Sequence, residues 1–181
     1  ASGQRLDYWR SLAKQAADSP LVNAYYALAF ARAGDVEQAR HVSDSMMERH
    51  PHHPDTVLCG GLIACLSGDP DTGVARIRAV VKEHPESAGS AAAHLDEIAL
   101  MLMEKDQLAQ SESLLKEASA LEPENLLYCM HLGEVLLKLE RIEEAIEKFE
   151  RILTAVPDSP RTAALLEEAL RRKQDLEGRS R

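Results

Sequence analysis

Hydrophobic residues recur along this chain with the spacing of one helical face, and the same pattern returns four times. The prolines Pro51, Pro85, Pro123 and Pro157, which lie 34, 38 and 34 residues apart, align the four segments. With each of these prolines counted as repeat position 32, apolar residues gather at positions 4, 7 and 11 and again at positions 20, 24 and 27. Each segment is therefore predicted to form a pair of helices, and a period in this range is typical of a stack of repeated helix pairs.

Small residues mark the place where the two helices of a pair are expected to meet. Positions 8 and 20 hold Gly, Ala or Ser in all four units, and small side chains let helix axes approach closely. The residues are Ala27, Gly61, Ala99 and Gly133 at position 8, and Ala39, Gly73, Ser111 and Ala145 at position 20.

The turns between the paired helices are signalled clearly in two units. Gly34-Asp35 and Gly68-Asp69 place a glycine where a left-handed residue ends the first helix and an aspartate where a side chain can cap the second. The other two units have Lys105-Asp106 and Glu140-Arg141 at this place, which is a weaker turn signal.

These positions together resemble the tetratricopeptide repeat, whose pattern has large apolar residues at positions 4, 7, 11 and 24, small ones at 8, 20 and 27, and Pro at 32. Residues 126–159 match best, and residues 54–91 match least well because Gly60 occupies position 7. Four units in register cover residues 20 to 159. The resemblance implies an all-α fold, a right-handed superhelical solenoid of stacked antiparallel helix pairs.

The ends of the chain extend the pattern. Arg5 to Pro20 align with Ala145 to Pro160, so the chain opens with something like the second helix of a unit, and Glu167 replaces the small residue of position 8 in the last helix. That last helix is predicted to be a polar cap. The predicted organisation is an N-terminal half-repeat or cap helix (1–19), four units (20–53, 54–91 with an insert, 92–125 and 126–159), and a C-terminal capping helix and tail (160–181).

Four additional residues lie around Glu86 to Ala91, where the repeat interval lengthens to 38 residues. They predict a longer loop or an extra helical turn, a local change in stacking angle, and a contact with a bound partner.

The resemblance also implies a concave groove lined by positions 2, 5, 9 and 12 of the first helices. The groove is predicted to be apolar, with carboxylates that select Lys or Arg on the guest, and an apolar or amphipathic peptide or helix is its natural occupant. The alternative is that the chain's own terminal helix fills it. The residues predicted to bind a partner are Leu28, Leu58, Leu62, Cys65, Asp96, Leu100, Met103, Met130, Glu134 and Leu137.

Composition narrows the range of partners. The chain is 45% hydrophobic and 28% charged, which fits a folded helical protein, and its net charge of −9 disfavours nucleic acid and favours basic or apolar protein partners. No apolar run is long enough for a membrane span. The three cysteines, an odd number, are interpreted as reduced thiols, which favours a cytoplasmic over a periplasmic location.

Candidate chemistry is sparse. The segment His50-Pro-His52-His53 resembles a metal-binding run, but it lies in a turn between repeats, and neither a metal nor a cofactor is predicted. No catalytic motif is present, so an enzyme is not expected. Members of the resembled family that bind the acidic C-termini of heat-shock chaperones use Lys, Asn and Arg side chains. This chain has Ala24, Leu28, Cys59, Ala93 and Glu97 at the corresponding places.

Three functions remain as hypotheses. The leading one is a non-catalytic module whose groove binds a peptide or helix of a partner protein. The second is a structural spacer or a self-association scaffold, in which the terminal faces stack in a homo-oligomer. The third is an accessory domain of a larger protein that carries its catalytic activity elsewhere.

Overall fold

A computed structural model of the protein describes residues 2–179, with side chains from residue 5 to residue 178, and every regular element in that range is helical. The chain divides into two compact units, and the boundary between His94 and Leu95 falls inside one helix, α6.

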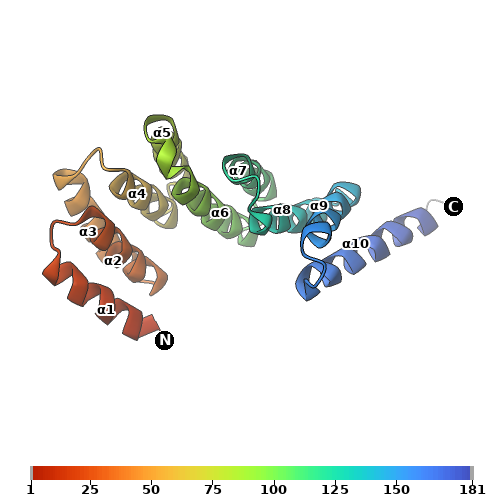
Figure 1. Ribbon diagram of the computed structural model, residues 1–181, viewed down its shortest axis with the longest axis horizontal. Coiled ribbons are helices and arrows are strands. Elements are labelled where there is room, and N and C mark those ends of the chain that lie inside the picture. The colour runs from red at the N-terminus through yellow and green to blue at the C-terminus, as the bar shows by residue number, and fades with distance from the viewer. Residues whose placement is uncertain (1, 180–181) are drawn as a thin grey trace. The chain divides into compact units, whose positions relative to one another are not determined.

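Unit 1 contains five complete α-helices, a short 3-10 helix and the first residues of α6 (Figure 1). Helix α1 packs on α2, α2 packs on both α3 and α4, and α4 packs on α3 and α5, which is the neighbour pattern of stacked helix pairs. The elements are α1 (Ser2–Gln15), α2 (Pro20–Arg32), α3 (Val36–Arg49), α4 (Pro54–Leu66), α5 (Pro70–Glu83), the 3-10 helix η1 (Pro85–Ser87) and α6 (Ala88–Glu104).

Unit 2 continues from α6 with α7 (Leu108–Leu121), α8 (Leu126–Lys138), α9 (Ile142–Ala155) and α10 (Pro160–Arg179). Helix α8 packs on α7 and α9, and α10 packs on α9 and more lightly on α8. The even-numbered helices are first-type helices of the repeat, and the odd-numbered ones are second-type helices. The predicted all-α architecture of stacked antiparallel helix pairs is confirmed.

The predicted contact between positions 8 and 20 is present. A Cβ atom built on Gly61 of α4 would lie only 2.8 Å from the carbonyl oxygen of Gly73 in α5. In the following pair, the Ser111 hydroxyl of α7 donates a hydrogen bond of 2.7 Å to the carbonyl of Ala99 in α6. Small residues at these positions therefore let the two helix backbones nearly touch.

The turns between paired helices share one backbone conformation. Gly34 and Gly68 have φ angles of 87° and 95°, as their glycines predict. The helices that follow are capped by carboxylates, since Asp35 and Asp69 each accept a hydrogen bond from a backbone amide in the first turn. In unit 2 the same place is held by Asp106 and Glu140, with φ angles of 61° and 58°. The left-handed turn therefore forms in unit 2 without the glycine that normally relieves its strain.

The additional residues of the 38-residue interval form a turn of helix. Helix α6 has 17 residues, whereas α2, α4 and α8 have 13 each, and the 3-10 turn Pro85–Ser87 precedes it. Of the two local structures predicted for this interval, the extra turn is the one observed.

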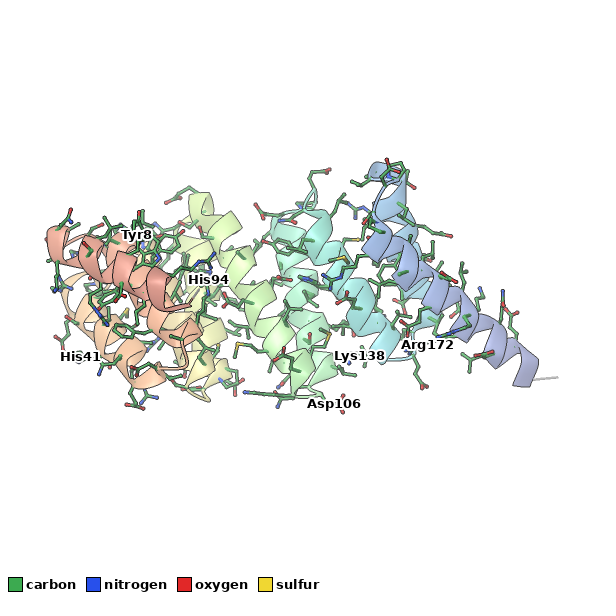
Figure 2. All side chains as sticks on the ribbon, turned by 90° about the horizontal axis from the view of Figure 1, so that it is seen from below. Tyr8, His41, His94, Asp106, Lys138 and Arg172 are labelled. Carbon is green, nitrogen blue, oxygen red and sulfur yellow. The ribbon has the colours of Figure 1, made fainter. Side chains whose placement is uncertain are left out.

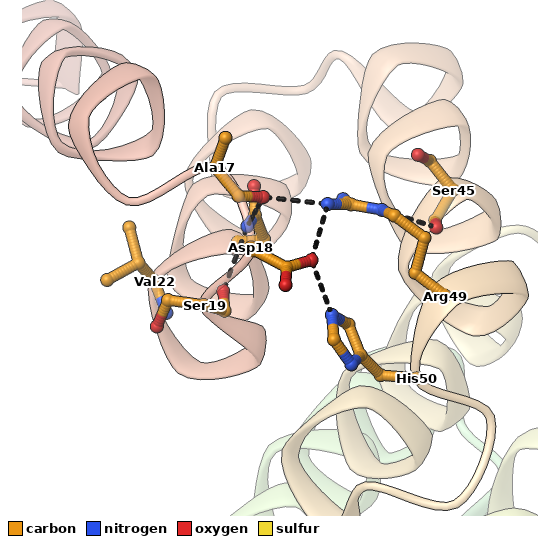
Figure 3. A network of polar contacts seen from close by, with 8 residues as sticks. Ala17, Asp18, Ser19, Val22, Ser45, Arg49 and His50 are labelled. Atoms are coloured by element: carbon orange, nitrogen blue, oxygen red, sulfur yellow. Dashed lines mark hydrogen bonds and ion pairs between the residues drawn. The ribbon is translucent and has the colours of Figure 1, made fainter.

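A polar network fastens the turn between α1 and α2 to the end of α3 (Figure 3). The Arg49 guanidinium donates to the carbonyl of Ala17 at 2.7 Å and to the Asp18 carboxylate at 3.5 Å. His50 Nε2 lies 3.1 Å from the same carboxylate. Because these contacts join the α1–α2 turn to the next repeat, they hold α1 in its place against α2.

Candidate partner-binding surfaces

Unit 1 contains a small pocket of about 90 Å³ between α2, α4 and the start of α6. Two predicted binding residues, Leu28 and Leu58, are buried at its base, and Leu21 and Tyr25 stand exposed at its rim. Its lining is completed by Ala24, Asp55, Cys59, Ser90 and His94.

Polar groups lie along one side of this pocket. The Asp55 carboxylate lines it, and the imidazole of His53 lies 3.8 Å from that carboxylate. Ser90 and His94 come from α6, and Figure 2 labels His94 on that helix. Burial, with the nearby charge of Asp55, raises the pKa of the Cys59 thiol to about 12, so this thiol stays protonated and unreactive.

Two other predicted groove residues of unit 1 lie in the core instead. Leu62 is fully buried. The Cys65 side chain points toward α5: its thiol lies 3.7 Å from the Pro70 carbonyl, and a Cβ atom on Gly73 would come within 2.3 Å of its sulfur. The absence of a side chain on Gly73 creates the space that Cys65 fills, which corrects the prediction that Cys65 faces a partner.

In unit 2 the predicted carboxylate Asp96 is paired within the protein. Its Oδ1 lies 2.7 Å from Nδ1 of His131, and the two side chains are 10% and 7% exposed. A carboxylate can only accept, so Nδ1 of His131 carries the shared proton. This pair joins α6 to α8 and removes Asp96 from the set of freely exposed groove charges.

The remaining predicted residues of unit 2 range from buried to partly exposed. Leu137 and Met130 are buried, while Leu100, Met103 and Glu134 are half-buried. The Glu134 carboxylate accepts a hydrogen bond of 2.7 Å from Arg161 of α10. Leu127, at position 2 of α8, is 47% exposed and is the most accessible large apolar side chain of that helix.

Within α8, burial and the nearby carboxylate of Glu122 raise the pKa of Tyr128 to about 12, so its hydroxyl keeps its proton at neutral pH.

A larger groove lies between α1 and α2, with a volume of about 420 Å³. Trp9 stacks on Tyr25 with ring centres 4.8 Å apart, and Tyr8, which Figure 2 labels on α1, meets the edge of Trp9 at 5.3 Å. Tyr8 is 59% exposed and Tyr25 is 43% exposed. We call this surface the N-terminal groove; it is lined by Arg5, Tyr8, Trp9, Tyr25, Ala29, Arg32 and Ala33.

Helix α10 presents a second open surface, beside α9, with a volume of about 610 Å³. Thr162 and Ala169 on its other side are buried against the repeat, so α10 is seated on one side only within the described residues. We call the open side the α10 face; it is lined by Leu153, Ala163, Ala164, Leu166, Glu167, Glu168, Leu170, Arg171 and Gln174.

The histidine-rich turn is used for local contacts. His50 contacts Asp18 and His53 lies near Asp55. Within the described part of the chain, no group of three or more His, Cys, Asp or Glu side chains is arranged to hold a metal ion. None of the described helices combines the length and the apolar character that crossing a membrane requires.

Sequence reasoning missed the His131 side chain and the Arg5, Tyr8 and Tyr25 members of the N-terminal groove. For His131 a signal existed: it follows Asp96 by 35 residues, and adjacent first-type helices place position 5 of one unit beside position 6 of the next. The N-terminal groove had a signal too, because Trp9 aligns with the buried Phe149 while no earlier unit is present in the described residues to cover it.

Helix pairs stacked in this way define a helical-repeat fold. Residues 102–169 match the family described as tetratricopeptide repeat. The predicted resemblance is confirmed for residues 102–169, which carry the family's sequence pattern.

Solved structures show the same fold. Residues 41 to the end of MamA from Desulfovibrio magneticus RS-1 align at 23% identity with a TM-score of 0.59, covering 87% of this chain and 88% of that one. A thermophilic tetratricopeptide-repeat protein of Thermus thermophilus aligns at 17% identity and a TM-score of 0.68, covering 91% and 88%. PilF of Pseudomonas aeruginosa aligns at 20% and 0.60, covering 96% and 71%. A comparison with curated protein sequences found no match.

The family match implies a role in protein–protein interaction or as a scaffold, and repeats of this kind are typically non-catalytic. The family match does not specify a partner, since fold alone does not determine function.

Proposed function

We propose that this protein is a non-catalytic interaction module and that the concave pocket of unit 1 binds an apolar or amphipathic segment of a partner protein. The observation that carries the proposal is the combination, in one pocket, of the exposed Leu21 and Tyr25 with the carboxylate of Asp55. Apolar side chains that stay exposed next to a concavity are typical of binding surfaces.

The pocket favours a particular guest. Leu28 and Leu58 form an apolar base that suits one aliphatic or aromatic side chain, since a volume of about 90 Å³ holds little more. Asp55 favours a Lys or Arg next to that side chain, and the net charge of −9 favours basic partners in general. A short amphipathic helix, or an extended peptide with a basic residue beside an apolar one, meets both requirements.

Unit 2 offers a separate surface of similar character. Leu127 is exposed, Leu100 and Met103 are half-buried, and Met130 is at the edge of burial. Methionine side chains adapt to differently shaped apolar guests because they are flexible and polarisable. Glu134, already bonded to Arg161, keeps an acidic character on this surface. We propose that it binds a second apolar stretch of a partner.

The test begins with a random peptide library displayed on phage and selected on the purified chain. Selected peptides are expected to pair an apolar residue with Lys or Arg, and their affinity is measured by isothermal titration calorimetry. Leu21→Arg should weaken binding by at least about tenfold, since it places an unfavourable charge at the pocket rim. Val156→Arg is the matched control, because Val156 is 44% exposed in the turn between α9 and α10.

Asp55→Asn tests the charge selection. It should weaken a peptide with its basic residue by about fivefold to tenfold and leave unchanged a peptide in which that residue is replaced by Gln. Equal affinity of Leu21→Arg and the parent chain for every selected peptide would contradict a binding role of this pocket.

A further inference from the structure

The stack is hollowed at one place between internal helices of unit 1. In α4, positions 7 and 11 hold Gly60 and Ala64, whereas the other three repeats have large apolar residues at both positions. Position 24 of the preceding repeat, which faces Gly60, is Ser43, although the other repeats have Ile, Leu or Phe there. These three small residues line one cavity of about 260 Å³. We call it the α3–α5 cavity; it is lined by Arg40, Ser43, Asp44, Gly60, Ile63, Ala64, Ser67, Asp69 and Arg76.

Such a cavity is costly unless something occupies it. Replacing large core residues by small ones removes packing contacts, and the loss of stability grows with the volume that is left empty. Three such replacements converge on one place here, while the other repeats of the chain keep the large residues. Local departures from a consistent pattern are typical of functional sites, so the space is interpreted as a ligand site.

The base of the cavity is apolar. Gly60 and Ile63 are buried and Ala64 is half-buried. Ser43, which is 3% exposed, adds a hydroxyl group. The Arg76 guanidinium reaches from α5 across this base and donates a hydrogen bond of 3.3 Å to the carbonyl of Gly60. Because a guanidinium has further N–H groups, Arg76 can also donate to an acceptor inside the cavity.

Each wall of the cavity carries one base and one acid. Helix α3 contributes Arg40 and Asp44. Helix α5 contributes Arg76 and, at its N-cap, Asp69. Hydrogen bonds from Thr72 hold the pKa of Asp69 below its ordinary value, so this carboxylate is charged at neutral pH. A simple anion would be attracted by the two guanidiniums and repelled by the two carboxylates, so the lining favours a guest with charges of both signs.

Unit 2 closes the equivalent gap with an ion pair of its own. There Glu112, at position 21 of α7, lies 2.6 Å from Arg141 at the N-cap of α9. In unit 1 the same two positions hold Arg40 and Asp69, with the charges reversed, yet no ion pair joins them within the described residues. A guest that presents a carboxylate to Arg40 and an ammonium group to Asp69 would bridge the gap that is open here.

We propose that the α3–α5 cavity binds a free aliphatic α-amino acid. Its carboxylate accepts hydrogen bonds from the two guanidiniums, whose planar N–H groups match a carboxylate, and its ammonium group lies beside the two carboxylates. Its side chain packs on Ile63 and Ala64. The volume of about 260 Å³ suits a molecule of this size and lies below the usual range for larger ligands. A protein segment suits the cavity less well because its backbone carries neither charge.

The ligand is tested with L-leucine and with analogues that each lack one group. Amide chemical shifts in two-dimensional NMR should change saturably on titration with L-leucine, and the changes should centre on the residues that line the cavity. Isocaproate lacks the ammonium group and isoamylamine lacks the carboxylate, so each should bind on the order of tenfold more weakly. Glycine lacks the aliphatic side chain and should also bind more weakly than L-leucine.

The site is tested by filling the cavity from within. A Cβ atom on Gly60 would meet only side-chain atoms, the nearest being Ser43 Oγ at 3.4 Å, so α4 can accept a side chain there. Gly60→Leu restores the apolar residue of position 7. It should lose saturable binding of L-leucine and unfold at a higher temperature than the parent chain.

A charge variant tests the site without filling it. Arg76→Gln removes one guanidinium and should weaken binding of L-leucine on the order of tenfold. Lys82→Gln, at an exposed site of α5 outside the cavity, is the matched control and should bind like the parent chain. Circular dichroism checks that each variant keeps its helices, and Arg76→Gln still tests the site if Gly60→Leu does not fold.

Three results would overturn the proposal. They are the absence of saturable shifts with L-leucine, equal affinity for L-leucine and isocaproate, and undiminished affinity in Arg76→Gln or in folded Gly60→Leu. These outcomes are independent of peptide binding at the concave pocket of unit 1, since the two sites share no lining residue.

Discussion

Neighbouring first-type helices make the same contact in the two units with different chemistry. In unit 1, position 5 meets position 6 as the Ala24 carbonyl and the Cys59 thiol, a weak contact of 3.6 Å beside an open pocket. In unit 2 the equivalent contact is the buried pair of Asp96 and His131, 2.7 Å apart. The comparison shows that the repeat geometry prescribes which positions meet but leaves their chemistry free. In unit 1 the Asp55 carboxylate lines the pocket, whereas in unit 2 Asp96 is paired with His131 inside the protein.

The largest expected effect comes from breaking the buried pair. His131→Ala should lower the free energy of unfolding by about 3 kcal/mol, because Asp96 would be left buried without its partner. Urea unfolding followed by circular dichroism measures the change.

The matched double variant places at this contact the residue types that unit 1 has there, Ala and Cys. Asp96→Ala combined with His131→Cys should recover most of the loss, since the pair is then replaced by uncharged groups. A loss below about 1 kcal/mol in His131→Ala alone would show that water or another group satisfies Asp96.

A smaller effect is expected at the turns, which also differ between the units. Glu140 holds a φ of 58° in the left-handed region that Gly34 and Gly68 adopt without a Cβ atom. Glu140→Gly should raise the free energy of unfolding by about 0.5 to 1 kcal/mol, and Gly34→Ala should lower it by about 1 kcal/mol. Thermal unfolding of both variants measures these changes, and Gly178→Ala in the last helix is a control that leaves the turns untouched. A destabilised Glu140→Gly would mean that the Glu140 side chain makes a contact worth more than the strain.

The smallest effect concerns the ion pairs of the partly buried Glu112 in unit 2. Glu112 lies 2.6 Å from Arg141 and also contacts Lys116. Burial acts to raise the pKa of Glu112, but hydrogen bonds from Lys116 and Arg141 outweigh it and hold that pKa below its ordinary value. Its stabilisation is therefore present above about pH 5 and is lost as the pH falls through the lowered pKa.

Glu112→Gln should therefore cost less than about 1 kcal/mol at pH 7 and lose its effect in strong acid, below the lowered pKa. Unfolding free energies of both proteins, measured across this range, test the difference. The equivalent positions of unit 1 carry the opposite charges, Arg40 and Asp69, so Arg40→Gln serves as the comparison in that unit. A constant difference between Glu112→Gln and the parent chain at all pH values would contradict this account.

The helix pairs could be predicted from the sequence because they depend only on which repeat positions hold apolar and small residues. Small residues at positions 8 and 20, such as Gly61 and Gly73, are enough to identify the contacting faces. The place of the turn at Glu140 could be predicted by alignment with the other units. Its left-handed backbone could not be predicted, because glutamate is not a residue that favours a positive φ.

Side-chain directions were harder to predict because they depend on local space. Cys65 shares its repeat position with groove residues, yet the missing side chain of Gly73 leaves room for it toward α5. Asp96 was predicted to face a partner, and only the contact with His131 from the next repeat shows that it is bonded internally. Such outcomes depend on pairs of residues far apart in sequence, which a periodic pattern does not contain.

The contact between Gly61 and Gly73 also limits which helices can pair while the chain folds. A methyl group on Gly73 would lie 2.4 Å from the Gly61 carbonyl oxygen, so the place that α5 takes in its pair with α4 does not fit a second-type helix with a side chain at that position, such as Ala39 of α3. Chains built of similar repeats are prone to mispairing of one repeat's helix with another's. Gly61 and Gly73 therefore favour the pairing of α4 with α5 over pairings with similar helices, which helps to keep the repeats in order.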